Sequence, residues 1–221
     1  MKNHTTIRPL LAGAGLALIT TGAAVAGGFD TSAFLAADLD LSGGLSTTEF
    51  NTTLDAGLSL RAQAKSFRRA DLNRDGSVQV NEFLLFNGTI DPSNALELAF
   101  YRADASIDGT LDFEEFTSTY KAKVSLVNIR RSFLRADVNV DESVTLTEYL
   151  NFRRGQTPPL TDVTIFELAD FDGNAQVTLT EFGYWFAQTA NETAVTTRFG
   201  RLDANSDGFL TTSEWNPGVR L

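Results

Sequence analysis

An acidic stretch returns along this chain at a fixed interval. The stretches begin at aspartates spaced 33 residues apart: Asp38, Asp71, Asp104, Asp137, Asp170 and Asp203. A constant period of this kind indicates one structural unit, repeated so that neighbouring units bury their apolar faces against each other. Ankyrin-type solenoids share this period, but their Thr-Pro-Leu-His signature is absent from the sequence. The content of each repeat therefore has to decide the fold.

Each stretch carries oxygen-bearing side chains at positions 1, 3 and 5 and a glutamate at position 12, while position 7 offers its backbone carbonyl. Such spacing suits a hard divalent cation such as Ca²⁺, which takes about 6 to 8 oxygen ligands at about 2.3–2.6 Å. The candidate ligands, loop by loop, are Asp38, Asp40, Ser42, Gly44 and Glu49; Asp71, Asn73, Asp75, Ser77 and Glu82; Asp104, Ser106, Asp108, Thr110 and Glu115; Asp137, Asn139, Asp141, Ser143 and Glu148; Asp170, Asp172, Asn174, Gln176 and Glu181; Asp203, Asn205, Asp207, Phe209 and Glu214. In the third loop, Asp112 at position 9 adds a further carboxylate.

These twelve-residue stretches resemble the EF-hand loop, and the resemblance covers all six repeats. It implies an all-α fold of six EF-hand helix-loop-helix units in three pairs, with one-residue β bridges between paired loops, and it implies Ca²⁺ as the bound ion. Two loops depart from the pattern at position 6, where the sharp turn favours glycine: Glu142 and Ala175 stand there. A side chain held at positive φ costs about 1–2 kcal/mol. We therefore expect loops 4 and 5 to be the weakest sites.

Aromatic and apolar residues around the loops repeat with the same period. A phenylalanine stands four residues before every loop: Phe34, Phe67, Phe100, Phe133, Phe166 and Phe199. An aromatic residue follows every position-12 glutamate: Phe50, Phe83, Phe116, Tyr149, Phe182 and Trp215. Position 8 is always leucine or valine. We expect the aromatic residues to form the core and the position-8 residues to join paired loops.

The position-12 glutamate has a second interpretation that involves no metal. In four loops a serine or threonine at position 9 precedes it by three residues, as in Ser46 and Glu49, and this spacing is that of a helix capping box. Capping alone does not require oxygen-bearing side chains at positions 1, 3 and 5. We therefore expect the glutamate to serve both as a cap and as a ligand.

Prolines indicate how the hands are grouped. Pro92 follows the second loop and Pro158 follows the fourth, whereas no proline interrupts the links within hands 1–2, 3–4 or 5–6. The predicted organisation is a pair at 27–90, a second at 91–157 and a third at 158–221.

Residues 1–26 have the features of a secretory signal peptide. Lys2 and Arg8 precede an apolar run over 10–25, which ends in the small residues of an Ala24-Val25-Ala26 cleavage site. A membrane anchor is the alternative, but the run is short and contains three glycines. We expect export to a periplasm or the extracellular space, with no membrane contact after cleavage.

Composition limits what the exported chain can do. The sequence has no cysteine, and cleavage would remove its only histidine and its only methionine. The usual general bases, thiol nucleophiles and zinc ligands would be missing, so we do not expect an enzyme. The net charge of −10 would become −12, because 16 basic residues would face 28 acidic ones, and this disfavours nucleic acid as a partner.

The predicted function is therefore calcium binding, in a structural or buffering role or in calcium-dependent binding of a protein partner that the sequence does not identify. A sensor with a methionine-rich groove is disfavoured because no methionine would remain. The alternative is a periplasmic lanthanide-binding protein similar to lanmodulin. Its loops have proline at position 2, where this chain has none, and added acids at position 9, which only the third loop has.

Overall fold

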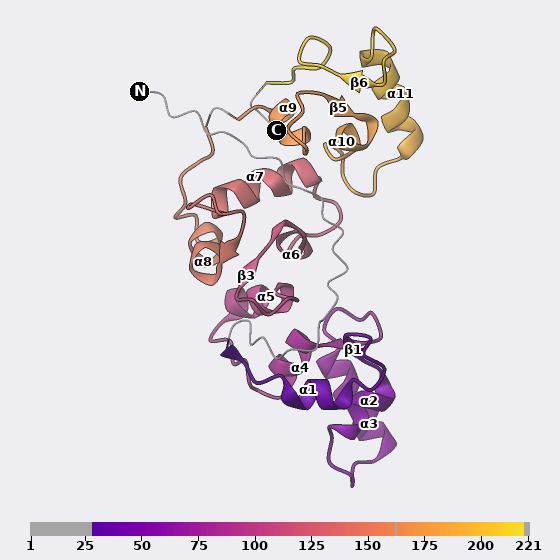
Figure 1. Ribbon diagram of the computed structural model, residues 1–221, viewed down its shortest axis with the longest axis vertical. Coiled ribbons are helices and arrows are strands. Elements are labelled where there is room, and N and C mark those ends of the chain that lie inside the picture. The colour runs from indigo at the N-terminus through magenta and orange to yellow at the C-terminus, as the bar shows by residue number, and fades with distance from the viewer. Residues whose placement is uncertain (1–27, 162, 219–221) are drawn as a thin grey trace. The chain divides into compact units, whose positions relative to one another are not determined.

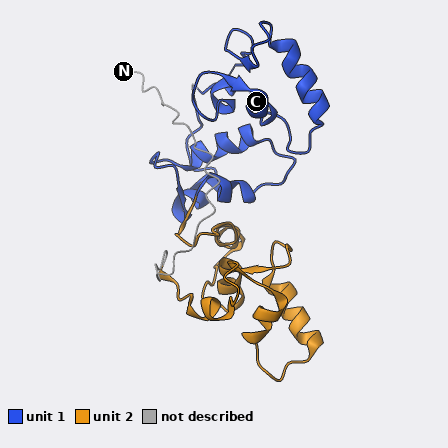
Figure 2. Cartoon of the chain, turned by 45° about the vertical axis from the view of Figure 1, so that its right-hand side comes forward, with its two compact units in different colours: residues 1–15, 112–221 blue, residues 16–111 orange. Residues whose placement is uncertain are grey.

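The computed structural model describes residues 28–218 except 162, so the predicted signal peptide at 1–26 lies outside the described residues (Figure 1). The described chain divides into two compact units, at 28–111 and 112–218, which Figure 2 colours separately. Across these residues, no helix combines the length and the apolar character needed to span a bilayer. The grouping into pairs at 27–90, 91–157 and 158–221 stays a prediction.

The unit at 28–111 contains two complete hands and the first half of a third. Its elements are, in order, α1 (Ser32–Ala37), β1 (Gly44–Leu45), α2 (Thr47–Thr52), α3 (Leu60–Ala70), β2 (Val78–Gln79), α4 (Val80–Phe86), α5 (Ala95–Ala103) and β3 (Thr110–Leu111). Loop 1 joins α1 to α2, and loop 2 joins α3 to α4. Loop 3 begins after α5 and crosses into the other unit.

The unit at 112–218 contains the rest of hand 3 and hands 4 to 6. Its elements are α6 (Phe113–Ser118), α7 (Leu126–Ala136), β4 (Val144–Thr145), α8 (Leu146–Arg153), α9 (Ile165–Ala169), β5 (Val177–Thr178), α10 (Leu179–Gly183), α11 (Glu192–Leu202) and β6 (Phe209–Leu210). Loop 4 joins α7 to α8, loop 5 joins α9 to α10, and loop 6 follows α11.

Capping boxes start the helices that leave the first five loops. In loop 1 the Glu49 amide donates to Ser46 Oγ at 3.3 Å, while the Ser46 amide donates to Glu49 Oε2 at 2.9 Å. The boxes expected in loops 4 and 5 are present, and Gln79 and Asp112 form further ones in loops 2 and 3. The glutamate therefore does cap a helix, as the spacing predicted.

Loop 6 departs from the predicted helix-loop-helix pattern. The Thr211 amide donates to Glu214 Oε2 at 3.0 Å as expected, but the Glu214 amide donates to the Thr211 carbonyl at 3.1 Å instead of to its hydroxyl, so the predicted capping box is incomplete. The described chain from Thr211 onward forms a single turn at 212–214 and no helix. Pro217 supplies the reason, because its ring removes an amide donor and disfavours helical backbone at the residue before it. The prediction of six complete helix-loop-helix units is therefore wrong for the exit helix of hand 6.

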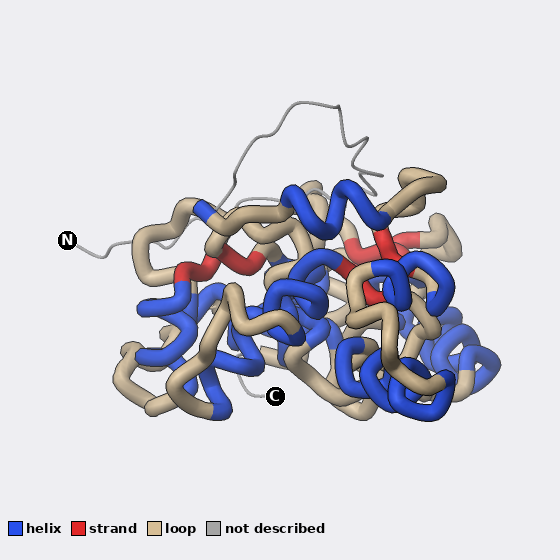
Figure 3. The backbone as a smooth tube through the Cα atoms, turned by 90° about the horizontal axis from the view of Figure 1, so that it is seen from below, coloured by secondary structure: helices blue, strands red, loops and turns tan. Residues whose placement is uncertain are grey.

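Short antiparallel ladders join loops within each unit; their strands are drawn in red in Figure 3. Leu45 lies opposite Val78, and Val177 lies opposite Leu210, so position 8 meets position 8 in both ladders as expected. Each strand has two residues instead of the predicted one. One flanking residue also pairs, as Gly44 does with Gln79, and a Cβ atom at Gly44 would overlap Ser77 Oγ.

The repeated aromatic residues form the cores, as predicted. All twelve are buried, with at most 8% of their surface exposed. They pack reciprocally within a pair: Phe34 contacts Phe83 with ring centroids 5.9 Å apart, and Phe50 contacts Phe67 at 5.6 Å. Hands 5 and 6 repeat this exchange, since Phe182 contacts Phe199 at 5.7 Å. The ring before one loop thus contacts the ring after its partner loop, and this holds the two hands together.

Candidate metal-binding loops

The first aspartate of every loop closes the turn in the same way. Its Oδ2 accepts a hydrogen bond from the amide of position 6 at 2.9–3.2 Å in all six loops. In the loops with a carboxylate at position 5, that side chain also accepts from the amide of position 7, as Asp75 does from Ser77 at 2.9 Å. These bonds curve the backbone so that alternate side chains point to the centre of the loop.

The position-12 glutamate reaches back across the loop. Its Oε2 accepts from the amide of position 9 at 2.9–3.1 Å in all six loops. Its Oε1 accepts from the amide of position 2 at 2.9–3.3 Å in loops 1, 2, 4, 5 and 6. In loops 1, 2, 4, 5 and 6 the glutamate carboxylate therefore bonds to the backbone directly after the first aspartate.

Three carboxylates converge in two of the loops. Asp38, Asp40 and Glu49 place oxygens within 4.8 Å of one another, and Asp170, Asp172 and Glu181 do the same. Such clusters of oxygen donors fit a hard cation.

Loops 2, 4 and 6 have asparagine at position 3 instead of aspartate. In each of these loops the asparagine Nδ2 donates to the carboxylate of position 5, at 2.8–2.9 Å. The position-5 carboxylate of these loops is therefore already hydrogen-bonded to the asparagine, and among the described residues the convergence of three carboxylates seen in loops 1 and 5 is not found in them.

Loop 3 is divided between the two units. Asp104, Ser106 and Asp108 belong to the unit at 28–111, and Glu115 belongs to the unit at 112–218. Within the first part, Asp108 accepts from the amide of Thr110 at 2.8 Å. The complete ligand set of loop 3 stays a prediction.

Burial and hydrogen bonding shift the acidity of the loop carboxylates in opposite directions. Burial raises the pKa of the position-1 side chains Asp104, Asp137 and Asp170. Hydrogen bonds from Ser42 lower the pKa of Asp40, and those from Ser46 lower the pKa of Glu49. The buried position-1 charges are thus poorly solvated, and a bound cation would offset that cost.

Backbone strain in the loops occurs at two positions. Position 6 has positive φ as expected, including 69° at Glu142 and 64° at Ala175. Position 4 also has positive φ in every loop, which was not expected from the sequence: Leu41, Arg74, Ile107, Val140, Gly173 and Ser206 all adopt it, between 56° and 69°.

The position-4 angles separate loop 4 from loop 5 in backbone strain, whereas the expectation that both are weak sites stays a prediction. Loop 4 holds two non-glycine residues at positive φ, Val140 and Glu142, and is the most strained of the six. Loop 5 has Gly173 at position 4, so Ala175 leaves it with a single strained residue, as in loops 1, 2, 3 and 6. Glycine at position 4 was the signal in the sequence that marks this difference.

Comparison with known proteins identifies the motif. The EF hand family model matches residues 63–87 and 196–216, which contain loops 2 and 6. The chain therefore contains EF-hand motifs at these two sites. A search of curated proteins found no significant match.

Solved structures of two other proteins match parts of this chain. A homologue of programmed cell death 6 protein from Leishmania major is 28% identical over 54% of this chain and 71% of that chain, with a TM-score of 0.24. A calcium-binding protein from Streptomyces coelicolor is 15% identical over 82% of this chain and 86% of that chain, with a TM-score of 0.21. At such TM-scores the assignment depends on the family model and on the loops.

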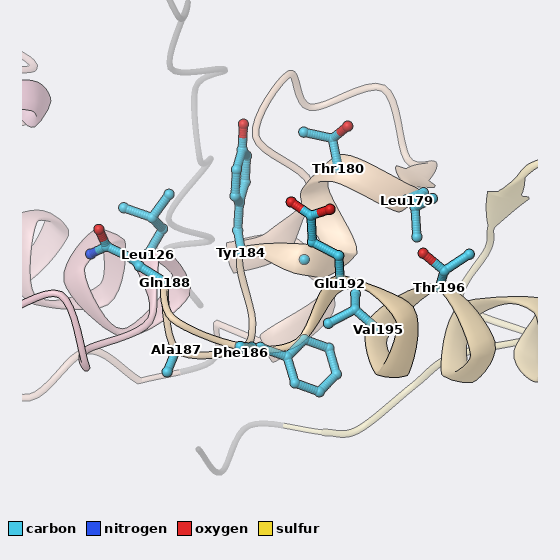
Figure 4. A pocket seen from close by; sticks show the side chains of 12 residues that line it. Leu126, Leu179, Thr180, Tyr184, Phe186, Ala187, Gln188, Glu192, Val195 and Thr196 are labelled. Carbon is cyan, nitrogen blue, oxygen red and sulfur yellow. The ribbon is translucent and has the colours of Figure 1, made fainter.

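A cavity of about 550 Å³ lies beside hands 5 and 6 in the unit at 112–218 (Figure 4). Tyr184, Phe186 and Val195 line it together with the carboxylate of Glu192 and with Leu126 from the start of α7. None of the predicted metal ligands lines this cavity. It is therefore separate from the loops, although α10, which leaves loop 5, forms part of its wall.

Proposed function

We propose that this chain is an exported calcium-binding protein that holds one Ca²⁺ in each of six loops. The observation that carries the proposal is the convergence of three carboxylates in loops 1 and 5. The backbone hydrogen bonds to the carboxylates of positions 1 and 12 recur in all six loops and support extending it to the others. Export is proposed from the signal-like residues 1–26.

Calcium is the ion that best suits the donors. Every predicted side-chain ligand offers oxygen, whereas softer metals prefer nitrogen or sulfur. Six Ca²⁺ ions would balance the charge of −12 expected after cleavage. Extracellular EF-hands commonly bind with Kd values of about 10⁻⁴–10⁻³ M, and most of these loops have only three carboxylates, which fits modest affinity.

The role we propose is structural or buffering, and not catalytic. Binding would relieve repulsion among the crowded carboxylates and would stabilise the packed hands by mass action. A calcium-dependent protein partner fits the same role.

Calorimetric titration of residues 27–221 with Ca²⁺, with Mg²⁺ as the comparison, tests this proposal. We expect six calcium sites in the protein, and four in the double variant Glu49→Gln/Glu181→Gln, which loses the position-12 carboxylate of loops 1 and 5. A protein that retains no Ca²⁺ at millimolar concentration would overturn the proposal.

Calcium removal provides a second test. Because the ions bind the folded protein, a chelator should lower the melting temperature markedly, and excess Ca²⁺ should restore it. A chelated protein that melts as high as the loaded one would contradict a stabilising role.

A further inference from the structure

A buried arginine connects hand 4 to loop 5. Arg130, in α7, is fully buried, and its Nη1 donates to the carbonyl oxygens of Leu168 at 3.1 Å and Asp170 at 2.7 Å. Asp170 is position 1 of loop 5, and Asp137, which directly follows α7, is position 1 of loop 4. The helix that leads into one candidate site thus holds the backbone at the start of the next, and α7 and α9 are in contact (Figure 1).

Loop 5 presents an aromatic ring to this arginine. The guanidinium carbon of Arg130 lies 4.5 Å from the ring centroid of Phe171, at position 2 of loop 5. Phe171 is only 9% exposed, whereas position 2 is 77% exposed in loop 1 (Leu39) and 57% in loop 4 (Val138). Phe113 and Tyr184 also pack on the ring, at centroid distances of 5.7 and 4.9 Å. Loop 5 is therefore anchored in the interior by a residue at a position that loops 1 and 4 leave in solvent.

Phe171 also connects Arg130 to Glu181, the position-12 glutamate of loop 5. The amide of Phe171 donates to Glu181 Oε1 at 2.9 Å, so the residue that stacks on Arg130 also holds a predicted ligand. Burial lowers the pKa of Arg130 to about 10, and the neighbouring carboxylates of Asp170 and Glu181 act in the opposite direction. Arg130 therefore stays charged at neutral pH and interacts electrostatically with two of the converging carboxylates.

We propose that Arg130 is a positioning residue that couples cation binding at loop 4 to cation binding at loop 5. Filling loop 4 fixes Asp137 and the end of α7; α7 then holds Arg130 against Phe171 and the Asp170 carbonyl, in the arrangement that brings Asp170 and Glu181 together. The β ladder of loop 5 leads to loop 6, so it provides no direct path to loop 4. This inference rests on the calcium binding proposed above.

The experiment is a Ca²⁺ titration of the purified protein followed by the backbone amide signals of position 6 in separate loops. The amide of Ala175 reports loop 5, because it donates to Asp170 Oδ2, and the amide of Glu142 reports loop 4 through Asp137. The amide of Gly76 reports loop 2 in the other unit and serves as the reference. A Glu148→Gln substitution disables loop 4, and Arg130→Met removes the connection.

In the otherwise unchanged protein, we expect Glu148→Gln to weaken Ca²⁺ binding at loop 5 by about fivefold, the lower end of typical coupling energies. In the Arg130→Met protein, Glu148→Gln should change loop 5 by less than about twofold. Arg135→Met is the matched control: Arg135 lies on the same helix but contacts Pro158 and Phe152, so the fivefold effect should persist. A purely structural role for Arg130 would lower stability without abolishing the dependence on loop 4.

An equal effect of Glu148→Gln with and without Arg130, or no effect in either protein, would overturn the inference. If Arg130→Met does not fold, Arg130→Lys keeps the charge but loses the flat guanidinium surface that stacks on Phe171, and should also bring the effect below about twofold. If none of the three amides responds to Ca²⁺, the proposed calcium binding itself fails. If the amides respond but loop 5 is independent of loop 4, only the coupling fails.

Discussion

The turn of loop 4 gives the sharpest quantitative prediction. Glu142 has a φ of 69° and an exposed side chain, so replacing it with glycine removes strain without removing packing. The amide of residue 142 would still donate to Asp137 Oδ2, because that bond uses only the backbone of residue 142. Glu142→Gly should therefore stabilise the calcium-loaded protein.

The size of the gain follows from two opposing effects. Removing a side chain from a residue with left-handed backbone stabilises the folded protein by about 1–2 kcal/mol. The greater conformational freedom of glycine in the unfolded chain lowers the free energy of unfolding by about 0.4–1 kcal/mol. We expect a net increase of about 1 kcal/mol in the free energy of unfolding of the calcium-loaded protein. If the strain is present only with the ion bound, the same energy appears as an approximately fivefold lower Kd at loop 4.

Urea unfolding in saturating Ca²⁺ measures this change, and Glu142→Gln is the matched control. The glutamine variant removes the negative charge but keeps the backbone strain, so it should show no comparable gain. If the glycine variant is no more stable than the parent, or if the glutamine variant is equally stabilised, backbone strain at Glu142 does not limit the stability of the protein.

Two further predictions concern other residues. Gly76→Ala in loop 2 should lower the free energy of unfolding by about 1 kcal/mol in a urea titration, because the φ of Gly76 is 90°. Steric overlap is not the cause, since nothing lies within 4 Å of the place a Cβ atom would take. Gly57→Ala is the control: its site is equally free of neighbours but has no positive φ, so the substitution should cost nothing. Burial raises the pKa of Tyr149, so its contribution to stability is complete below the unfolded pKa of about 10 and is lost as the pH rises through the folded value. The Tyr149→Phe protein should consequently lose less stability than the parent between about pH 9 and pH 12, and equal losses in the two proteins would contradict this.

Much of the fold could be predicted because each hand is encoded locally. The aromatic residues on either side of every loop are buried where the period placed them, and Leu45 and Val78 pair as position 8 should. The predicted exit helix of hand 6 failed because it was inferred from the pattern of loop residues, whereas Pro217 governs the backbone that follows them. The ladders are also longer than the expected single bridges. Once the position-8 residues Leu45 and Val78 pair, their neighbours Gly44 and Gln79 are in register and pair as well.

The sequence by itself determined the candidate ligands, because all five ligand positions of a loop lie within twelve consecutive residues and local hydrogen bonds fold that segment. Only the tertiary structure decided that loop 5 is hydrogen-bonded to the helix that precedes loop 4. Arg130 and Asp170 are separated by 40 residues, and they meet because α7 packs against α9. No periodicity distinguishes that arginine from those on solvent-facing helix surfaces, since burial depends on which helices come together and not on the residue's place in its own repeat.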